Sequence, residues 1–119
     1  MARDAPPIDA YGDGGFRVAG VRREGSLLIV GDAAYDWPVR RREDLDVGSL
    51  AAVFAAGRAQ VEFLLLGMGA ANALPTREVR DAVLAAGLGL EFMDTPSAAR
   101  LYNVLTSEGR RLACALIAV

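Results

Sequence analysis

The second half of the chain alternates apolar runs with amphipathic stretches, and this alternation narrows the possible folds more than any other feature. Residues 61–66 form a nearly unbroken apolar run, as expected for a strand that is covered on both faces. Residues 88–93 and 112–119 are two further strands by the same pattern. Strand–helix–strand connections of this kind are right-handed parallel crossovers in nearly all proteins. We therefore predict a parallel β-α-β-α-β sheet from Val61 onward.

Helical periodicity predicts three helices. The first ends at Gly57, and the second has Pro75 in its first turn and ends at Gly87. The third has Thr95 as a cap and Pro96 at its first helical position, and it ends at Gly109. Their expected inner faces hold Leu50, Val53 and Phe54, then Val79, Ala82, Val83 and Ala86, then Ala98, Leu101, Tyr102 and Leu105.

The first half predicts strands joined by glycine turns. Residues 1–14, rich in proline, aspartate and glycine, read as an extended arm. Residues 16–19, 26–30 and 34–39 read as three short strands of an antiparallel meander, with Pro38 placing the third at an edge. The predicted fold class is α/β: one compact domain over residues 1–119, in which this meander joins the parallel sheet.

The composition excludes several chemistries. The 119 residues include no histidine and no lysine, so no Ser-His-Asp triad, imidazole metal ligand, Schiff base or P-loop lysine is possible. One cysteine cannot form an intrachain disulfide or a cysteine cluster. Cys114 sits in an apolar run and reads as a buried, inert thiol. We expect no cofactor and no transition metal.

Charge and hydropathy also limit the partners. The net charge of −2 lacks the basic excess of a nucleic-acid binder. The longest uncharged stretch, residues 63–76, is too short for a membrane span of about 20 residues, and no targeting pattern opens the chain. These features, with the single cysteine, predict a cytoplasmic protein without membrane insertion.

One basic run interrupts this pattern. Arg40, Arg41 and Arg42 are followed at once by acidic residues, so they read either as a solvated loop or as a patch for an acidic partner. Nearby Trp37 reads either as core or as an anchor for a partner.

Two loops follow predicted strands at what should be one edge of the sheet. Gly67, Met68 and Gly69 match only the first half of a dinucleotide-binding fingerprint and also suit a tight turn between close backbones. The loop of Asp94, Thr95, Pro96 and Ser97 leads into a helix N-terminus, where free N–H groups attract anions, although Asp94 or Thr95 would serve equally as a cap. The next helix carries Arg100, Asn103 and Ser107 on its polar face, either solvated or as a recognition surface.

Several of these segments recur together in a known family. They include Gly14-Gly15-Phe16-Arg17, Gly25-Ser26-Leu27, Trp37-Pro38, Gly67-Met68-Gly69, Met93-Asp94-Thr95, residues 99–105 and Glu108-Gly109-Arg110. In this order they make the chain, from about residue 8 to 119, resemble the family of mitochondrial respiratory complex I assembly factor three and its single-domain bacterial relatives, a domain-of-unknown-function family. The resemblance implies a compact mixed α/β fold and a role in complex I assembly.

Two departures from the family pattern bear on function. The family's glycine loop reads Gly-Thr-Gly, where this chain has Met68, and its later motif reads Arg-Thr-Tyr-Asn, where this chain has Leu101. Each departure removes a hydroxyl near the expected crevice, which favours binding over catalysis.

Two functions of different classes follow. The first is a non-enzymatic factor that binds protein partners, with respiratory complex subunits as the implied ones. The second is a small-ligand or nucleotide-binding domain, with or without enzymatic activity. In both, the predicted site is made of Gly67, Met68, Gly69, Asp94, Thr95, Ser97, Arg100, Tyr102 and Asn103.

Overall fold

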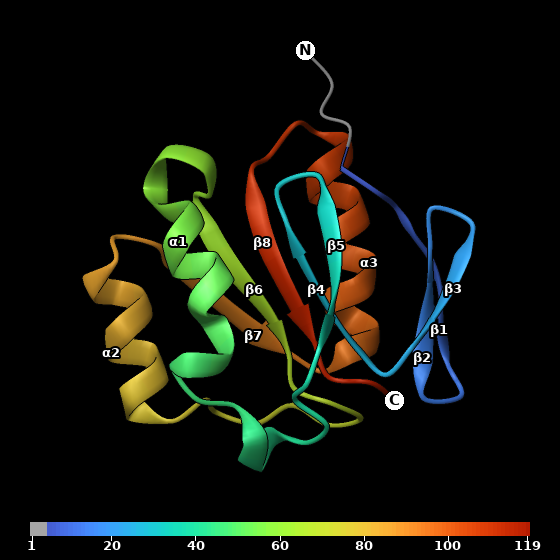
Figure 1. Cartoon of the computed structure of the whole chain (residues 1–119), viewed down its shortest axis with the longest axis horizontal. Coiled ribbons are helices and arrows are strands. Elements are labelled where there is room, and N and C mark those ends of the chain that lie inside the picture. The colour runs from blue at the N-terminus through green and yellow to red at the C-terminus, as the bar shows by residue number, and fades with distance from the viewer. Residues whose placement is uncertain (1–4) are drawn as a thin grey trace.

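Two sheets of unequal size organise the structure, a computed structural model that describes residues 5–119 (Figure 1). The smaller sheet is antiparallel, in the order β1 (Ile8–Gly12), β2 (Gly15–Val18) and β3 (Val21–Glu24). The larger sheet has the order β5-β4-β8-β6-β7. Its strands are β4 (Ser26–Val30), β5 (Ala33–Trp37), β6 (Phe63–Gly67), β7 (Gly89–Met93) and β8 (Leu112–Leu116).

The parallel half confirms the prediction. β6 pairs in parallel with β7 on one side and with β8 on the other. Helices α2 (Arg77–Ala85) and α3 (Thr95–Ser107) make the two crossovers. β4 then pairs antiparallel with β8 and joins the first half of the chain to the same sheet. None of the helices in residues 5–119 has the length and apolar character that a membrane crossing needs.

The apolar core lies on both faces of the larger sheet. Helices α1 (Ala51–Gln60) and α2 cover one face, and α3 and the smaller sheet cover the other (Figure 1). Within β6, Leu64 and Leu66 join the first cluster and Phe63 and Leu65 join the second. This two-sided burial is the reason that the strand reads as an unbroken apolar run.

The N-terminal predictions need correction. Residues 1–4 of the expected arm lie outside the described residues, and Ile8–Gly12 is a strand, not an arm. The predicted meander is confirmed for its last two strands, because β4 and β5 pair antiparallel in the larger sheet. It is wrong for its first strand, because the strand at Phe16 belongs to the smaller sheet. Strand β3 was not predicted, because its sequence Val-Arg-Arg-Glu shows no apolar alternation at an exposed edge of the sheet.

Two helix starts also differ from the prediction. Helix α2 begins at Arg77 with Thr76 as its N-cap, so Pro75 precedes the helix. Helix α3 begins at Thr95 itself, and Asp94 is the N-cap. Two short 3₁₀ turns, η1 (Arg42–Asp44) and η2 (Gly48–Leu50), lie between β5 and α1.

Candidate functional site

The two predicted loops lie side by side at the carboxyl ends of β6 and β7. The backbone N–H of Met68 donates to the carbonyl of Met93 at 2.7 Å. The N–H of Thr95 donates to the carbonyl of Gly69 at 2.8 Å. These contacts follow from the parallel pairing, which brings both strand ends to the same edge of the sheet.

Thr95 ties the loops to the third strand end. Its side chain is fully buried, and its Oγ1 accepts a hydrogen bond from the N–H of Gly69 at 3.0 Å and donates to the carbonyl of Ile117 at 2.7 Å. The predicted capping role of this hydroxyl is therefore wrong. Its hydrogen bonds join the segments after β6 and β8 to the start of α3.

Asp94 caps α3 in the place of Thr95. Its carboxylate accepts from the N–H of Ser97 at 2.8 Å and from the Ser97 hydroxyl at 3.0 Å. These hydrogen bonds, with a smaller contribution from nearby Arg100, lower the pKa of Asp94 below its usual value. The negative charge at this helix N-terminus is thus supplied by the chain itself.

The expectation of free amides at the start of α3 is not met. The N–H of Thr95 is bound to Gly69, Pro96 has no N–H, the N–H of Ser97 is bound to the Asp94 side chain, and the N–H of Ala98 donates to the Asp94 carbonyl at 3.0 Å. An anion arriving here would have to displace bonds that the native structure already makes.

The glycine loop is a tight turn between close backbones. A Cβ on Gly67 would lie 2.9 Å from Thr95 Oγ1 and 2.7 Å from a methyl of Leu116, so no side chain fits there. Gly69 has a φ of 105°, which favours glycine. The Met68 side chain is buried in the core on the α1 and α2 side, and its N–H is already paired.

The predicted residues on α3 mainly hold the N-terminal strand. The Asn103 side chain accepts from the N–H of Ile8 at 2.9 Å and donates to the Ile8 carbonyl at 2.7 Å, so it is no part of a freely solvated face. Tyr102 is buried and donates to the Pro6 carbonyl at 2.8 Å. Arg100 is exposed and donates to the Tyr11 hydroxyl at 2.9 Å.

Two grooves adjoin each other in this part of the molecule, and one of them includes the glycine loop. One, of about 420 Å³, brings Met68 and Gly69 together with Arg40, Arg41 and Arg42. The other, of about 490 Å³, lies between the smaller sheet and the end of β5 and shares Arg40 and Ala118 with the first. The arginine run is evident in the sequence, but its place beside the glycine loop is not, because the two segments are about 27 positions apart and meet only through the fold.

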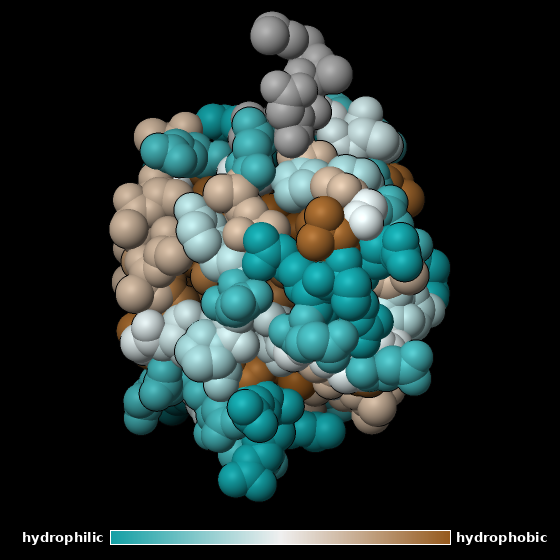
Figure 2. Space-filling view, turned by 45° about the vertical axis from the view of Figure 1, so that its right-hand side comes forward, coloured by the Kyte–Doolittle hydropathy of each residue, from teal (hydrophilic) through white to brown (hydrophobic). Residues whose placement is uncertain are grey.

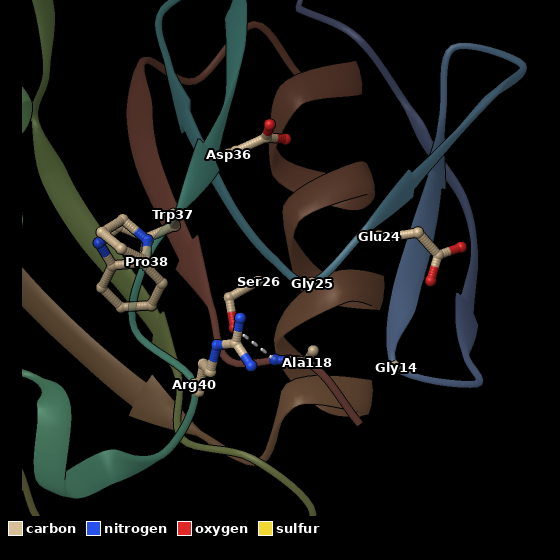
Figure 3. A pocket seen from close by; sticks show the side chains of 9 residues that line it. All are labelled: Gly14, Glu24, Gly25, Ser26, Asp36, Trp37, Pro38, Arg40 and Ala118. Carbon is tan, nitrogen blue, oxygen red and sulfur yellow. Dashed lines mark hydrogen bonds between the residues drawn. The ribbon is translucent and has the colours of Figure 1, made fainter.

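The larger of these grooves has a mainly apolar lining that also includes the charged residues Glu24, Asp36 and Arg40. Figure 3 shows the Arg40 side chain reaching toward the hydrogen bond between Ser26 and Ala118, with Glu24 and Asp36 further away. The ring of Trp37 points away from this groove and is buried in the core. Its Nε1 donates a hydrogen bond to the Ser49 carbonyl at 2.8 Å. The side of the molecule that carries the smaller sheet is mostly hydrophilic at its centre and lower part (Figure 2).

Residues 5–119 contain few groups that could support metal binding or thiol chemistry. Within that range, no three acidic or cysteine side chains lie close enough together to hold a metal ion. Cys114 lies in β8, fully buried, and burial raises the pKa of its thiol far above the ordinary value.

Comparisons with known proteins identify relatives of this chain. A protein of Rhodobacter capsulatus is 45% identical over 113 residues, which cover 95% of this chain and 85% of that protein. The NADH dehydrogenase [ubiquinone] 1 alpha subcomplex assembly factor 3 of Danio rerio is 34% identical over 92% of this chain. The chain spans only 63% of that relative's length.

Solved structures agree with the fold. An outer membrane protein from Bartonella henselae superposes with a TM-score of 0.91 at 30% identity, covering all of this chain and 99% of the other. The protein MT938, at 14% identity and a TM-score of 0.63, shows the same fold. The family model described as "Protein of unknown function (DUF498/DUF598)" matches residues 8–117. The resemblance that the sequence indicated is thereby confirmed, and the chain belongs to the DUF498/DUF598 family.

Proposed function

We propose that this chain is a non-enzymatic partner-binding factor that acts in the cytoplasm in the assembly or biogenesis of respiratory complex I. The observation that carries the proposal is the 34% identity with an assembly factor of that complex along 92% of this chain. Because the chain spans 63% of that relative, the part of the relative's role that it shares is itself part of the proposal.

The bonding at the candidate site supports binding over catalysis. The polar groups of the two loops are already bonded within the chain: the Thr95 hydroxyl joins the ends of β6 and β8, and the Asp94 carboxylate caps α3. Exposed Arg100 and the arginines at 40–42 remain for recognition. We infer that a partner binds over this edge, contacting Arg100 and the Arg40 groove, while Met68, Thr95, Tyr102 and Asn103 shape the surface from beneath.

Affinity capture with the tagged full chain from its native host tests this proposal. The expected result is the recovery of complex I subunits by the wild type, with much less recovery by Arg100→Glu. Arg77→Glu is the matched control, since Arg77 is exposed and lies on α2, which covers the face of the larger sheet opposite to α3. The free energy of unfolding of both variants should lie within about 0.5 kcal/mol of the wild-type value. Equal recovery by all three proteins would remove Arg100 from the binding surface.

A small-ligand role is the second candidate, favoured by one observation. The glycine loop and three arginines line the same groove of about 420 Å³, and arginine side chains bind phosphate and carboxylate groups well. A thermal-shift screen of nucleotides and small acidic metabolites tests it, because a ligand that binds only the native state raises the melting temperature. Stabilisation by one compound, lost in Arg40→Glu, would support this role. A flat response across the screen would count against it.

The cellular compartment is a separate part of the proposal. A single cysteine, buried in β8, fits a reducing compartment. Fractionation of the native host should recover the chain with the cytoplasmic proteins, and recovery in an outer-membrane fraction would contradict the assignment.

A further inference from the structure

Strand β7 leaves one side of the larger sheet open. It hydrogen-bonds to β6 and stands at the end of the strand order, away from β5 (Figure 1). Its pairing with β6 runs in one continuous register from Gly89 to Met93, without a bulge or a proline. An edge of this kind presents unpaired backbone groups to any extended chain that approaches.

The outward-facing backbone groups can be identified. The N–H of Gly89 donates to the Glu62 carbonyl at 3.1 Å, and the Met93 carbonyl accepts from Met68 at 2.7 Å, so Gly89 and Met93 direct their backbone groups toward β6. Along a strand these directions alternate, and Leu90 and Phe92 therefore direct their N–H and C=O groups away from the sheet. Within residues 5–119, no strand pairs with that side.

The opposite edge of the sheet is protected, which sets β7 apart. Arg23 from β3 donates to the carbonyl of Ala34 in β5 at 3.3 Å and pairs with Asp36 at 3.1 Å. Charged side chains placed across an edge strand in this way prevent further pairing. Along β7 the one charged side chain is Glu91, which lies at the centre of the strand.

A groove of about 480 Å³ runs beside β7 on the α3 side. Its floor and walls are apolar, from Phe63, Leu101 and Leu105, and charged residues form its rim. Glu62 on that rim is already held by the backbone N–H of Arg111 at 3.1 Å and by Arg110 at 3.6 Å. Glu91 forms no ion pair with any residue in the range 5–119 and is exposed.

We propose that an extended segment of a partner protein adds to β7 as a further strand, with apolar side chains in this groove and a lysine or arginine opposite Glu91. The inference rests on the proposed function, because it describes the segment that a partner would present. The free backbone groups supply the affinity, and the groove and the Glu91 charge select the side chains. A second copy of this chain fits less well, since symmetric antiparallel pairing centred on Glu91 would place two like charges directly opposite each other.

The first experiment uses a synthetic peptide and the full chain labelled with ¹⁵N. The peptide is acetyl-Thr-Val-Thr-Lys-Thr-Val-Thr-amide, whose valines and lysine share one face of an extended strand. We expect saturable amide shifts and slowed hydrogen exchange at Leu90 and Phe92. The same peptide N-methylated on alternate amides should cause neither effect. Binding of both peptides alike, or shifts that leave β7 unaffected, would overturn the proposal.

The second experiment tests the charge at the centre of the strand. Replacing the peptide's lysine with glutamate should weaken binding to the wild type by about fivefold. The variant Glu91→Lys should prefer the glutamate peptide instead, and Glu78→Lys, an exposed substitution on α2, should keep the wild-type preference. Identical preferences in all three proteins would show that Glu91 selects nothing.

The two proposals fail separately. If capture recovers complex I subunits equally with wild type and Glu91→Lys, and the peptide causes no shifts at β7, the strand-addition proposal is wrong while the proposed function stands. If the peptide binds β7 as described and no complex I subunit is recovered, the proposed function is wrong and the edge site stands. A concentration-dependent dimer in sedimentation, together with slowed hydrogen exchange of β7 in that dimer, would instead assign the edge to a second copy of the chain.

Discussion

At the scale of single residues, the Thr95 hydroxyl carries the most weight in the candidate site. It satisfies the buried N–H of Gly69 and the buried carbonyl of Ile117 together. Thr95→Val keeps the shape and leaves both groups without a partner, so it should lower the free energy of unfolding by about 1–3 kcal/mol. Thr95→Ser keeps the hydroxyl, so its free energy of unfolding should fall by less. Urea unfolding of both variants measures the difference, and equal losses would show that the hydroxyl contributes nothing beyond packing.

The thiol of Cys114 should be unreactive in the folded protein. Burial in β8 raises its pKa, so the reactive thiolate is scarcely populated at neutral pH. A thiol reagent should label the native chain only as fast as the chain unfolds, and label it at once in denaturant. Rapid labelling without denaturant would contradict the burial of this strand.

At the scale of elements, the cap of α3 should make stability depend on pH in acid. The hydrogen bonds from Ser97 lower the pKa of Asp94 in the folded protein. The stability that the ionised carboxylate contributes is therefore fully present above the unfolded pKa of about 3.9, and it is lost as the pH falls through the lower folded pKa. Asp94→Asn can cap the helix but does not titrate.

The measurement for this prediction is the difference in unfolding free energy between wild type and Asp94→Asn across the acid range. Wild-type stability should fall more steeply than that of the variant below about pH 4. Parallel curves for the two proteins would assign the acid dependence to other carboxylates.

A substitution in the turn of the β2–β3 hairpin should increase the stability of the protein. Its turn places Ala19 at a φ of 49° and Gly20 at 81°, and a left-handed conformation costs a residue such as alanine about 1 kcal/mol. Asn is the preferred residue before Gly in such a turn. Ala19→Asn should therefore raise the melting temperature, whereas Ala10→Asn, in exposed β1, should not. A lower melting temperature for Ala19→Asn would show that the turn is not strained.

At the scale of the whole molecule, the two sheets should unfold together. Phe16 and Val18 of the smaller sheet lie in the same core cluster as Ile29, Leu65 and Leu116 of the larger one. Phe16→Ala should lower the free energy of unfolding by about 3–5 kcal/mol. Fluorescence of Trp37, in the larger sheet, should report the same midpoint as circular dichroism. Separate transitions for the two signals would show that the sheets are independent units.

Much of the larger sheet is predictable from local pattern. An apolar run such as residues 61–66 needs cover on both faces, and a helix between two such runs imposes a parallel crossover. The buried positions of Val79, Val83, Ala98 and Tyr102 follow from helical periodicity in the same way. Exposed β3 has no such pattern, because neither of its faces is buried well enough to select apolar residues.

Residue type and local spacing were sufficient to predict the strand and helix order from Val61, to exclude several chemistries and to indicate the family. The division of the N-terminal strands between two sheets and the hydrogen bonds between Asn103 and Ile8 became evident only in the folded structure. The folded structure likewise showed that the amides at the start of α3 are already bonded and that the arginine run lies beside the glycine loop. These are contacts between segments far apart in the chain, and such contacts depend on how the sheets pack, which local pattern does not encode.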